Sequence, residues 1–212
     1  MVSSNPAPSP AKKRSITPLI VLLAVCLAPV VFALLAYYVP GMGLRPSENV
    51  NYGALVEPQR PMPTADNLKL TTLDGQPFEL KSLEGQWLLL TADVGACPES
   101  CVKKLFTLRN SHASQGKNVE RLSRVWFVLD DAPISQQILD AYKGTHIVRV
   151  DPAQLAAYLE PEASPADSVP ALRGPMWIID PLGNLMMEFP ADADSIKVRK
   201  DISKLLYNSR IG

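Results

Sequence analysis

Two cysteines four positions apart, Cys97 and Cys101, are the residues of this chain best suited to chemistry. They lie in the stretch GACPESC, in which Pro98 directly follows the first cysteine. Two thiols at this spacing can exchange electrons as a reversible disulfide, hold a soft metal ion, or brace the fold as a permanent disulfide. The choice among these depends on the compartment, on the element that carries the pair, and on whether a third ligand exists.

The pair is expected at the start of a helix that follows a buried strand. The strand is predicted from the continuous apolar run at 87–94, and the helix from the spacing of apolar side chains over 98–116. Because proline is favoured in the first turn, we expect the helix to begin at Pro98 with Cys97 as its N-cap. Free backbone N–H groups and the helix dipole would then favour the thiolate of Cys97. This position predicts that Cys97 is the attacking thiol and Cys101 the resolving one.

The helical spacing also predicts which side chains of this helix face inward. The inward residues would be Val102, Leu105, Phe106 and either Leu108 or Arg109, and the outward residues Lys103 and Lys104. Cys101 lies one turn after Cys97, where Cβ atoms are about 5–6 Å apart, so a small local adjustment reaches the roughly 3.5–4.5 Å of a disulfide. Such a bridge closes a loop of only a few residues and stabilises little, which favours a reactive pair. A structural disulfide stays open as the alternative.

The N-terminal part of the chain predicts one transmembrane helix. Residues 16–39 contain no charged side chain over 24 positions, and about 20 apolar residues span a bilayer. A cleaved signal peptide would have a shorter apolar region. The basic cluster of Lys12, Lys13 and Arg14 precedes the span, so the positive-inside rule predicts a cytoplasmic N-terminus. In a Gram-negative bacterium the span would cross the inner membrane and the exported domain would lie in the periplasm, where disulfides form.

Composition divides the chain into four parts. Residues 1–15 are predicted to be a short cytoplasmic tail, and 16–39 the transmembrane helix. Residues 40–64 are rich in Pro, Gly and Asn and lack helical or strand periodicity, so we interpret them as a linker. The remaining residues, 65–212, have the usual size of one domain. Beyond position 40 there are 18 basic and 21 acidic residues without a basic stripe, so nucleic acid is not expected as a partner.

The domain alternates predicted strands and helices. This alternation predicts an α/β fold with a mixed sheet, largely parallel with antiparallel additions and covered by helices on both faces. The order fits a thioredoxin-like fold, in which the redox site lies between the first central strand and the first helix. The predicted strands and hairpins are 68–80, 87–94, 124–131, 146–151 and 176–190, the predicted helices are 98–116, 135–144, 152–161 and 195–209, and 163–175 is predicted to be a loop.

In these motifs the chain resembles the Sco/SenC family of membrane-anchored, thioredoxin-like proteins. FELKSLEGQWLLLTADVGACPESC is similar to the family's turn, central strand and cysteine loop, and WIIDPLGNLMMEF is similar to its late hairpin. The resemblance implies a role in cytochrome c oxidase assembly, either delivery of Cu(I) to the copper site or reduction of that site's thiols. The implied partners are the membrane and an oxidase subunit or other copper-site assembly proteins, and the implied ligands of Cu(I) are Cys97 and Cys101.

Two positions depart from the family pattern. Val102 stands where the family usually has a second proline, and Leu172 stands where the family has a metal-binding histidine. Neither of the two histidines of the chain, His112 and His146, is expected to reach the cysteines, and for both we predict a surface or capping role. Three methionines offer thioether sulfur but are interpreted as packing side chains: Met176, Met186 and Met187. Without the histidine, we expect weaker Cu(II) binding than in the family.

These residues are compatible with three functions. The favoured one is an assembly factor for cytochrome c oxidase that acts through the dithiol of Cys97 and Cys101, which as an enzyme would be a thiol–disulfide oxidoreductase. The alternative is a non-catalytic thioredoxin-like binding or scaffold protein that keeps these cysteines as a structural disulfide. A peroxidatic enzyme of the peroxiredoxin type is disfavoured, because Val94 stands where that pocket needs a threonine.

Overall fold

The computed structural model describes residues 15–38 and 51–212, which belong to two compact units. The N-terminal unit holds helix α1, and the C-terminal unit holds every other helix and strand of the described residues. Two predicted segments lie largely outside the described residues. These are the cytoplasmic tail with its basic cluster, at 1–14, and the end of the span with the first part of the linker, at 39–50.

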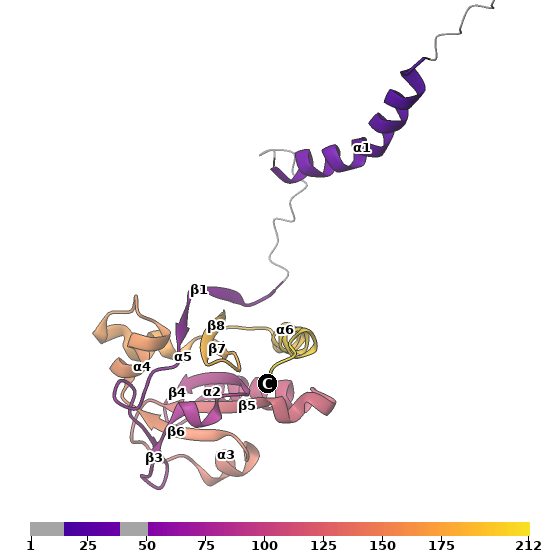
Figure 1. Ribbon diagram of the computed structural model, residues 1–212. Helices are drawn as coiled ribbons and strands as arrows, with labels where there is room; N and C mark the ends of the chain where they lie inside the picture. Colours follow the sequence, from indigo (N-terminus) through magenta and orange to yellow (C-terminus); the bar gives the residue numbers. More distant parts are fainter. Residues whose placement is uncertain (1–14, 39–50) are drawn as a thin grey trace, which may run out of the picture. The chain divides into compact units, whose positions relative to one another are not determined.

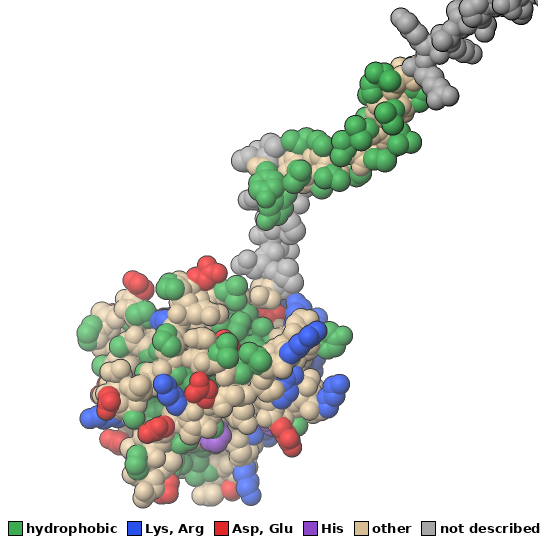
Figure 2. All heavy atoms as spheres, viewed as in Figure 1, with side chains coloured by type: hydrophobic (Ala, Val, Ile, Leu, Met, Phe, Trp, Pro, Cys, Tyr) green, Lys and Arg blue, Asp and Glu red, His purple; other side chains and the backbone are tan. Residues whose placement is uncertain are grey.

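Helix α1 (Thr17–Tyr38) is apolar along all of its 22 residues. Hydrophobic side chains surround it on every visible side, shown in green in Figure 2. Its length and composition are sufficient to cross a membrane, although Pro29 inside the helix removes one backbone hydrogen bond. The predicted apolar helix near the N-terminus is therefore confirmed and fits a single-pass anchor, whereas its orientation stays a prediction.

The C-terminal unit is built on one sheet of eight strands within residues 51–212, in the order β1-β8-β7-β4-β5-β6-β2-β3 (Figure 1). The strands are β1 (Ala54–Pro61), β2 (Leu70–Thr72), β3 (Pro77–Phe78), β4 (Trp87–Asp93), β5 (Leu122–Val128), β6 (His146–Val150), β7 (Met176–Ile179) and β8 (Asn184–Phe189). Only the pairs β4–β5 and β5–β6 are parallel, and every other pair of neighbouring strands in this sheet is antiparallel. The predicted α/β, thioredoxin-like fold with a mixed sheet is confirmed, but the expectation of a largely parallel sheet is wrong.

Helices cover both faces of this sheet. They are α2 (Glu99–Ala113), α3 (Gln136–Ala141), α4 (Pro152–Leu159), α5 (Ser168–Arg173) and α6 (Ser195–Asn208). Successive side chains of a strand point to opposite faces, so Leu88 and Leu90 of β4 pack in the cluster with α4 and α5, whereas Leu89 packs in the cluster with α2 and α6. All seven residues of β4 are buried for this reason, which explains its continuous apolar run.

The predicted linker contains a strand of the sheet. Strand β1 is the edge strand and pairs with β8 at Ala54 and Leu55 and again at Arg60 and Pro61, with an irregular stretch between. Most of its side chains are exposed, so the alternation that signals a half-buried strand is missing, and prolines are tolerated in a sheet only at such an edge. The prediction that 40–64 contain no strand is therefore wrong at β1, which moves the domain boundary that we infer from residue 65 to about residue 50.

The predicted loop at 163–175 contains the short helix α5. Its sequence is rich in proline and serine, which is typical of loops. However, Pro170 is only the third residue of α5, and the first four N–H groups of a helix have no partner within the helix. The proline therefore removes no hydrogen bond, and the helix forms against the prediction.

Buried Asp201 on α6 fixes the start of the C-terminal unit. Its Oδ2 accepts hydrogen bonds from the backbone N–H groups of Tyr52 (2.6 Å) and Gly53 (3.0 Å), directly before β1. These two donors lie far from Asp201 in the sequence, so the carboxylate joins the first and last elements of the unit. No periodic pattern in the sequence signals this contact.

Replacement of Asp201 by alanine leaves both N–H donors without their acceptor. We expect Asp201→Ala to lower the free energy of unfolding by about 1–3 kcal/mol, measured by urea unfolding of the full chain in detergent. The exposed Asp66 offers a matched control, and Asp66→Ala should change this free energy by less than about 0.5 kcal/mol. Equal unfolding midpoints for the two variants would contradict the anchoring role.

Candidate functional site

The two cysteines form a disulfide between strand β4 and helix α2. The sulfur atoms of Cys97 and Cys101 are bonded, and their Cα atoms lie 5.1 Å apart. Strand β4 ends at Asp93 and helix α2 begins at Glu99, so the bridge lies at the carboxyl edge of the parallel strands. The expectation that a pair at this spacing can close is confirmed, while the chemical role of the pair stays a prediction.

The start of α2 lies one residue later than predicted. Pro98, with an extended ψ of 176°, is the N-cap, and Cys97 precedes it in the left-handed region of backbone conformation, with φ of 42°. The N–H of Cys97 donates to the carbonyl oxygen of Val94 at 3.0 Å, which closes a tight turn before the helix. Proline has no side-chain acceptor, so no side chain caps the first turn of α2. The prediction of Cys97 as N-cap is wrong, but Cys97 remains next to this uncapped turn.

Both cysteine residues are buried, and they differ slightly in exposure. Cys101 is fully buried, and Cys97 is 7% exposed. Both pack in a cluster on the α2 side of the sheet, whose other buried members are Leu105, Trp126, Val128 and Tyr142. A partner from solution therefore meets Cys97 first, which supports its predicted role as the attacking thiol.

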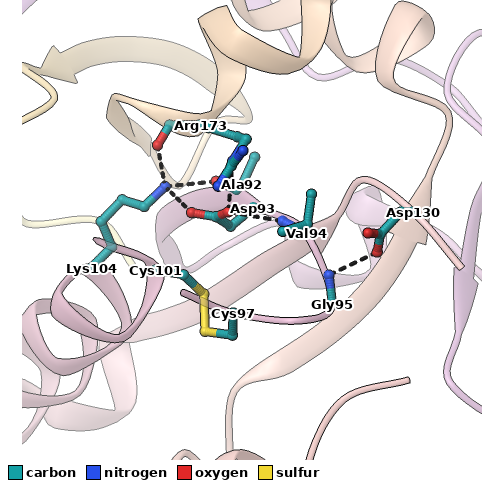
Figure 3. A network of polar contacts seen from close by, with 9 residues as sticks. All are labelled: Ala92, Asp93, Val94, Gly95, Cys97, Cys101, Lys104, Asp130 and Arg173. Atoms are coloured by element: carbon teal, nitrogen blue, oxygen red, sulfur yellow. Dashed lines mark hydrogen bonds and ion pairs between the residues drawn. A yellow bond between two sulfur atoms is a disulfide. The ribbon is translucent and has the colours of Figure 1, made fainter. Parts of the chain in front are cut away.

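The turn that carries Cys97 is held from the neighbouring loop. The N–H of Gly95 donates to Asp130 Oδ1 at 2.7 Å (Figure 3). A Cβ atom at Gly95 would lie 2.4 Å from the carbonyl oxygen of Ala132, so the close approach requires glycine. The guanidinium of Arg149 in turn donates to the carbonyl oxygens of Asp130 and Ala132. The position of the outer sulfur thus depends on a loop that follows β5.

A buried ion network lies beside the inner sulfur (Figure 3). The carboxylate of Asp93 lies 3.0 Å from Lys104 Nζ and accepts a hydrogen bond from Arg173 Nε at 2.9 Å. Lys104 Nζ also donates to the carbonyl oxygens of Ala92 (2.7 Å) and Arg173 (2.5 Å). Asp93 belongs to β4, Lys104 to α2 and Arg173 to α5. The network therefore joins three elements at the end of the sheet where the disulfide lies.

The prediction that Lys104 faces outward is wrong. Lys104 is 5% exposed, and burial lowers the pKa of its ammonium group, while the carboxylate of Asp93 acts in the opposite direction. Its position three residues after Cys101 places it on the inward face of α2, together with Leu108. Phe106, predicted inward, is instead 47% exposed. The available signal was Asp93, a carboxylate in an otherwise apolar strand, which requires a buried cation nearby.

Leu172, which stands at the position of the metal-binding histidine in the Sco pattern, does not face the cysteines. Leu172 of α5 is fully buried in the core cluster on the α4 and α5 side of the sheet, opposite to the cluster of Cys101. Within residues 15–38 and 51–212, no three His, Cys, Asp or Glu side chains are grouped so that they could hold a metal ion. Two cysteine sulfurs fit Cu(I), because soft thiolates select it once the disulfide is reduced, but they do not make a site with a histidine ligand.

The other candidate ligands have packing roles. His146 begins β6 with its ring 5.9 Å from the ring of Phe78, and His112 lies in the last turn of α2. Both histidines are half-buried, so of the predicted surface or capping role only the capping part fits, for His112 at the C-terminal turn of α2. Burial, together with the charge of Arg124, lowers the pKa of each ring. The three methionines pack against the core as predicted: Met176 and Met187 within it and Met186 at its border.

Removal of the central carboxylate should be the most damaging change to the ion network. We expect Asp93→Ala to lower the free energy of unfolding by about 3–5 kcal/mol, because it leaves Lys104 without its counter-ion. Lys104→Met should cost clearly less, since Asp93 keeps Arg173 and methionine fills a similar volume. The exposed neighbour Lys103 provides the control, and Lys103→Met should change this free energy by less than about 0.5 kcal/mol. Urea unfolding measures all three, and equal losses for Asp93→Ala and Lys103→Met would refute the role of the network.

A histidine at position 172 should not restore a three-ligand copper site. Leu172→His places a polar ring in an apolar cluster away from the cysteines, so we expect a loss of about 2–5 kcal/mol in unfolding free energy and no gain in Cu(II) affinity. Leu182, which is 64% exposed, serves as the matched control, because Leu182→His should leave stability nearly unchanged. Cu(II) binding is measured by titration of the reduced protein. Tight Cu(II) binding by Leu172→His but not by Leu182→His would contradict this placement.

Solved structures with the same fold include Sco proteins. Apo Sco1 from Thermus thermophilus is 18% identical with a TM-score of 0.52, over 75% of this chain and 99% of that chain. A thiol:disulfide interchange protein of the thioredoxin family from Chlorobium tepidum TLS is 14% identical with a TM-score of 0.51, over 70% and 97%. Yeast Sco1 with copper bound is 15% identical with a TM-score of 0.50, over 76% and 96%. At these identities the likeness shows the thioredoxin-like fold, which is the level at which the expected resemblance to Sco proteins is confirmed.

Sequence comparison gives a family for most of the folded unit. No curated protein matches the chain. The sequence model of one family, described as transmembrane-like, thioredoxin-like, C-terminal domain, matches residues 87–209. This match runs from β4 to the end of α6 and contains both cysteines and the whole ion network. The chain belongs to this family of transmembrane-like, thioredoxin-like C-terminal domains.

Proposed function

We propose that this chain is a membrane-anchored assembly factor for cytochrome c oxidase that acts through the dithiol of Cys97 and Cys101. The observation that carries the proposal is the asymmetry of the disulfide, with Cys97 at the surface end and Cys101 fully buried behind it. Sequential thiol exchange needs one cysteine that a partner reaches first, and Cys97 is the less buried of the two. The oxidase copper site as target is supported by the resemblance of the cysteine loop and late hairpin to Sco proteins, and by the shared fold.

In the proposed exchange the thiolate of Cys97 attacks one sulfur of a partner's disulfide. A mixed disulfide forms, and the first partner thiol leaves with the other sulfur. The thiolate of Cys101 then attacks the sulfur of Cys97, which closes the bridge seen in the structure and releases the second partner thiol. Two electrons pass to the partner in this cycle, and an exported dithiol must reduce the pair again.

The reduced pair can also carry Cu(I) as cargo. Two thiolates on residues whose Cα atoms lie 5.1 Å apart offer the soft ligands that select Cu(I) over harder ions. The described histidines and Leu172 supply no third ligand beside them, so Cu(I) would be held by the two thiolates alone and could pass to a partner by exchange of thiolate ligands. The dithiol of Cys97 and Cys101 could therefore serve the oxidase copper site in two ways, by delivery of Cu(I) or by reduction of that site's thiols.

The proposal includes a place in the cell. Helix α1 would anchor the chain in the inner membrane, with the N-terminus in the cytoplasm and the folded unit in the periplasm. The basic cluster before α1 supports this orientation by the positive-inside rule, and the disulfide supports an oxidising compartment.

Single cysteine variants test the assigned roles. Cys101→Ser removes the resolving thiol, so mixed disulfides with partner proteins should accumulate on Cys97 and appear in non-reducing gels of membrane extracts. Cys97→Ser removes the attacking thiol and should trap far less. If Cys97→Ser traps partners and Cys101→Ser does not, the assignment of the roles is reversed.

Burial of the bridge favours one alternative, a scaffold protein with a structural disulfide. Almost complete burial protects a disulfide from exchange, and both sulfurs lie in an apolar cluster. The reduction potential of the full chain separates the two functions. A value below roughly −300 mV, without stoichiometric Cu(I) binding by the reduced protein, would support the scaffold, and a higher potential or one Cu(I) per chain would support the dithiol.

A further inference from the structure

The outward face of helix α6 carries a concentration of positive charge. Four side chains of the helix are basic, and all four are exposed: Lys197, Arg199, Lys200 and Lys204. Its only acidic side chain, Asp201, is buried, and Asp194 directly before it caps the first turn. Figure 2 shows a group of Lys and Arg side chains, in blue, over α6 at the right of the folded unit. Beyond position 40 the chain has 21 acidic and 18 basic residues, so the sign of this face is opposite to that of this part of the chain as a whole.

Two large side chains that can enter an apolar environment lie on the same face. Ile196 is 54% exposed and Tyr207 is 85% exposed. Positions 196, 200, 203 and 207 recur every three or four residues, so their side chains form one stripe, about 16 Å long at roughly 1.5 Å per residue. The opposite side of the helix packs in the core: Val198, Ile202 and Leu206. Lysine between an isoleucine and a tyrosine suits the interface of a membrane, where amines contact lipid phosphates and tyrosine rings lie at the level of the headgroups.

The chain that comes from the apolar helix α1 reaches the folded unit at α6. Tyr52 is held to this helix and its cap at three points. Its N–H donates to Asp201 Oδ2 at 2.6 Å, its hydroxyl oxygen accepts from Asp194 N–H at 3.1 Å, and the centre of its ring lies 5.1 Å from Lys197 Nζ. Only residues 39–51 separate α1 from Tyr52. Among the described helices of the folded unit, α6 is therefore the one that the incoming chain contacts first.

We propose that the outward face of α6 lies against the anionic phospholipid headgroups of the membrane that α1 is proposed to cross. The inference rests on the anchoring in the proposed function and adds how the folded unit is oriented on that membrane. The basic side chains contact lipid phosphates, while Ile196 and Tyr207 enter the interface beside them. An acidic protein would also satisfy the charges, but the contact of the incoming chain with the same helix favours the membrane.

Fluorescence of the full chain in lipid vesicles tests this inference. Tyr207→Trp places an indole on the face, and Leu73→Trp places one at the turn between β2 and β3, where Leu73 is 41% exposed. The vesicles are phosphatidylcholine alone, or phosphatidylcholine mixed with an equal amount of phosphatidylglycerol. Both contain the same fraction of a lipid with a nitroxide on its headgroup, which quenches nearby indoles. The unsubstituted chain gives the background from the buried Trp87, Trp126 and Trp177.

The expected result is quenching of the indole at position 207 that is about twofold or more stronger with phosphatidylglycerol than without it. The indole at position 73 should be quenched alike in both kinds of vesicle. About 1 M NaCl, at which the Debye length is roughly 3 Å, should remove the difference at position 207. In the Tyr207→Trp chain, Arg199→Ser with Lys200→Ser should also remove most of it. The matched control, Lys69→Ser with Lys143→Ser at exposed positions before β2 and β6, should keep it. Circular dichroism melting checks that each variant is folded.

Flotation of phosphatidylcholine vesicles after an alkaline wash measures the anchoring by α1 separately. A chain that floats but is quenched alike with and without phosphatidylglycerol, or a difference that Arg199→Ser with Lys200→Ser leaves unchanged, overturns the inference and leaves the anchor and the dithiol intact. An acidic protein is then the occupant that the charges of α6 fit. A chain that does not float overturns the proposed anchoring together with this inference.

Discussion

The buried carboxylate of Asp93 is the interaction on which the cysteine end of the molecule depends. Lys104 on α2 and Arg173 on α5 approach it from helices that cover opposite faces of the sheet. The carbonyl oxygen of the same residue accepts a hydrogen bond from Leu129 N–H at 3.0 Å, directly after β5. A buried charge without its partner is costly, so these elements cannot shift independently of one another.

This constraint separates the environments of the two sulfur atoms. Cys101 is three residues from Lys104 on the same helix, so the ion network fixes the turn that carries it. The turn with Cys97 is held by backbone N–H groups instead of an ion pair of its own: Val94 N–H donates to Asp93 and Gly95 N–H to Asp130, in a loop that Arg149 positions. A fixed inner cysteine and an outer cysteine on a small turn suit a pair whose outer member reacts first.

Helices and strands that bury a regular pattern of apolar side chains could be predicted from the sequence. Elements without such a pattern could not be predicted. The apolar run of β4 and the helical spacing of apolar residues in α2 were sufficient to place the cysteines between these two elements. In both elements the apolar side chains of the pattern are largely buried. The edge strand β1 buries little, so no alternation marked it. Lys104 was assigned outward because its charge outweighed its position in the helical repeat, and only the three-dimensional contact with Asp93 explains its burial.

Because β1 belongs to the sheet, the folded unit begins only a short stretch of sequence after the apolar helix α1. Fifteen residues connect the end of α1 at Tyr38 to the start of β1 at Ala54, and a fully stretched chain of that length reaches about 50 Å. With α1 as the proposed anchor, the length of this connection sets an upper limit on how far the start of β1 can be from the membrane. The search for a partner then becomes two-dimensional, and a target in the same membrane is met at a high effective concentration without any additional binding contact.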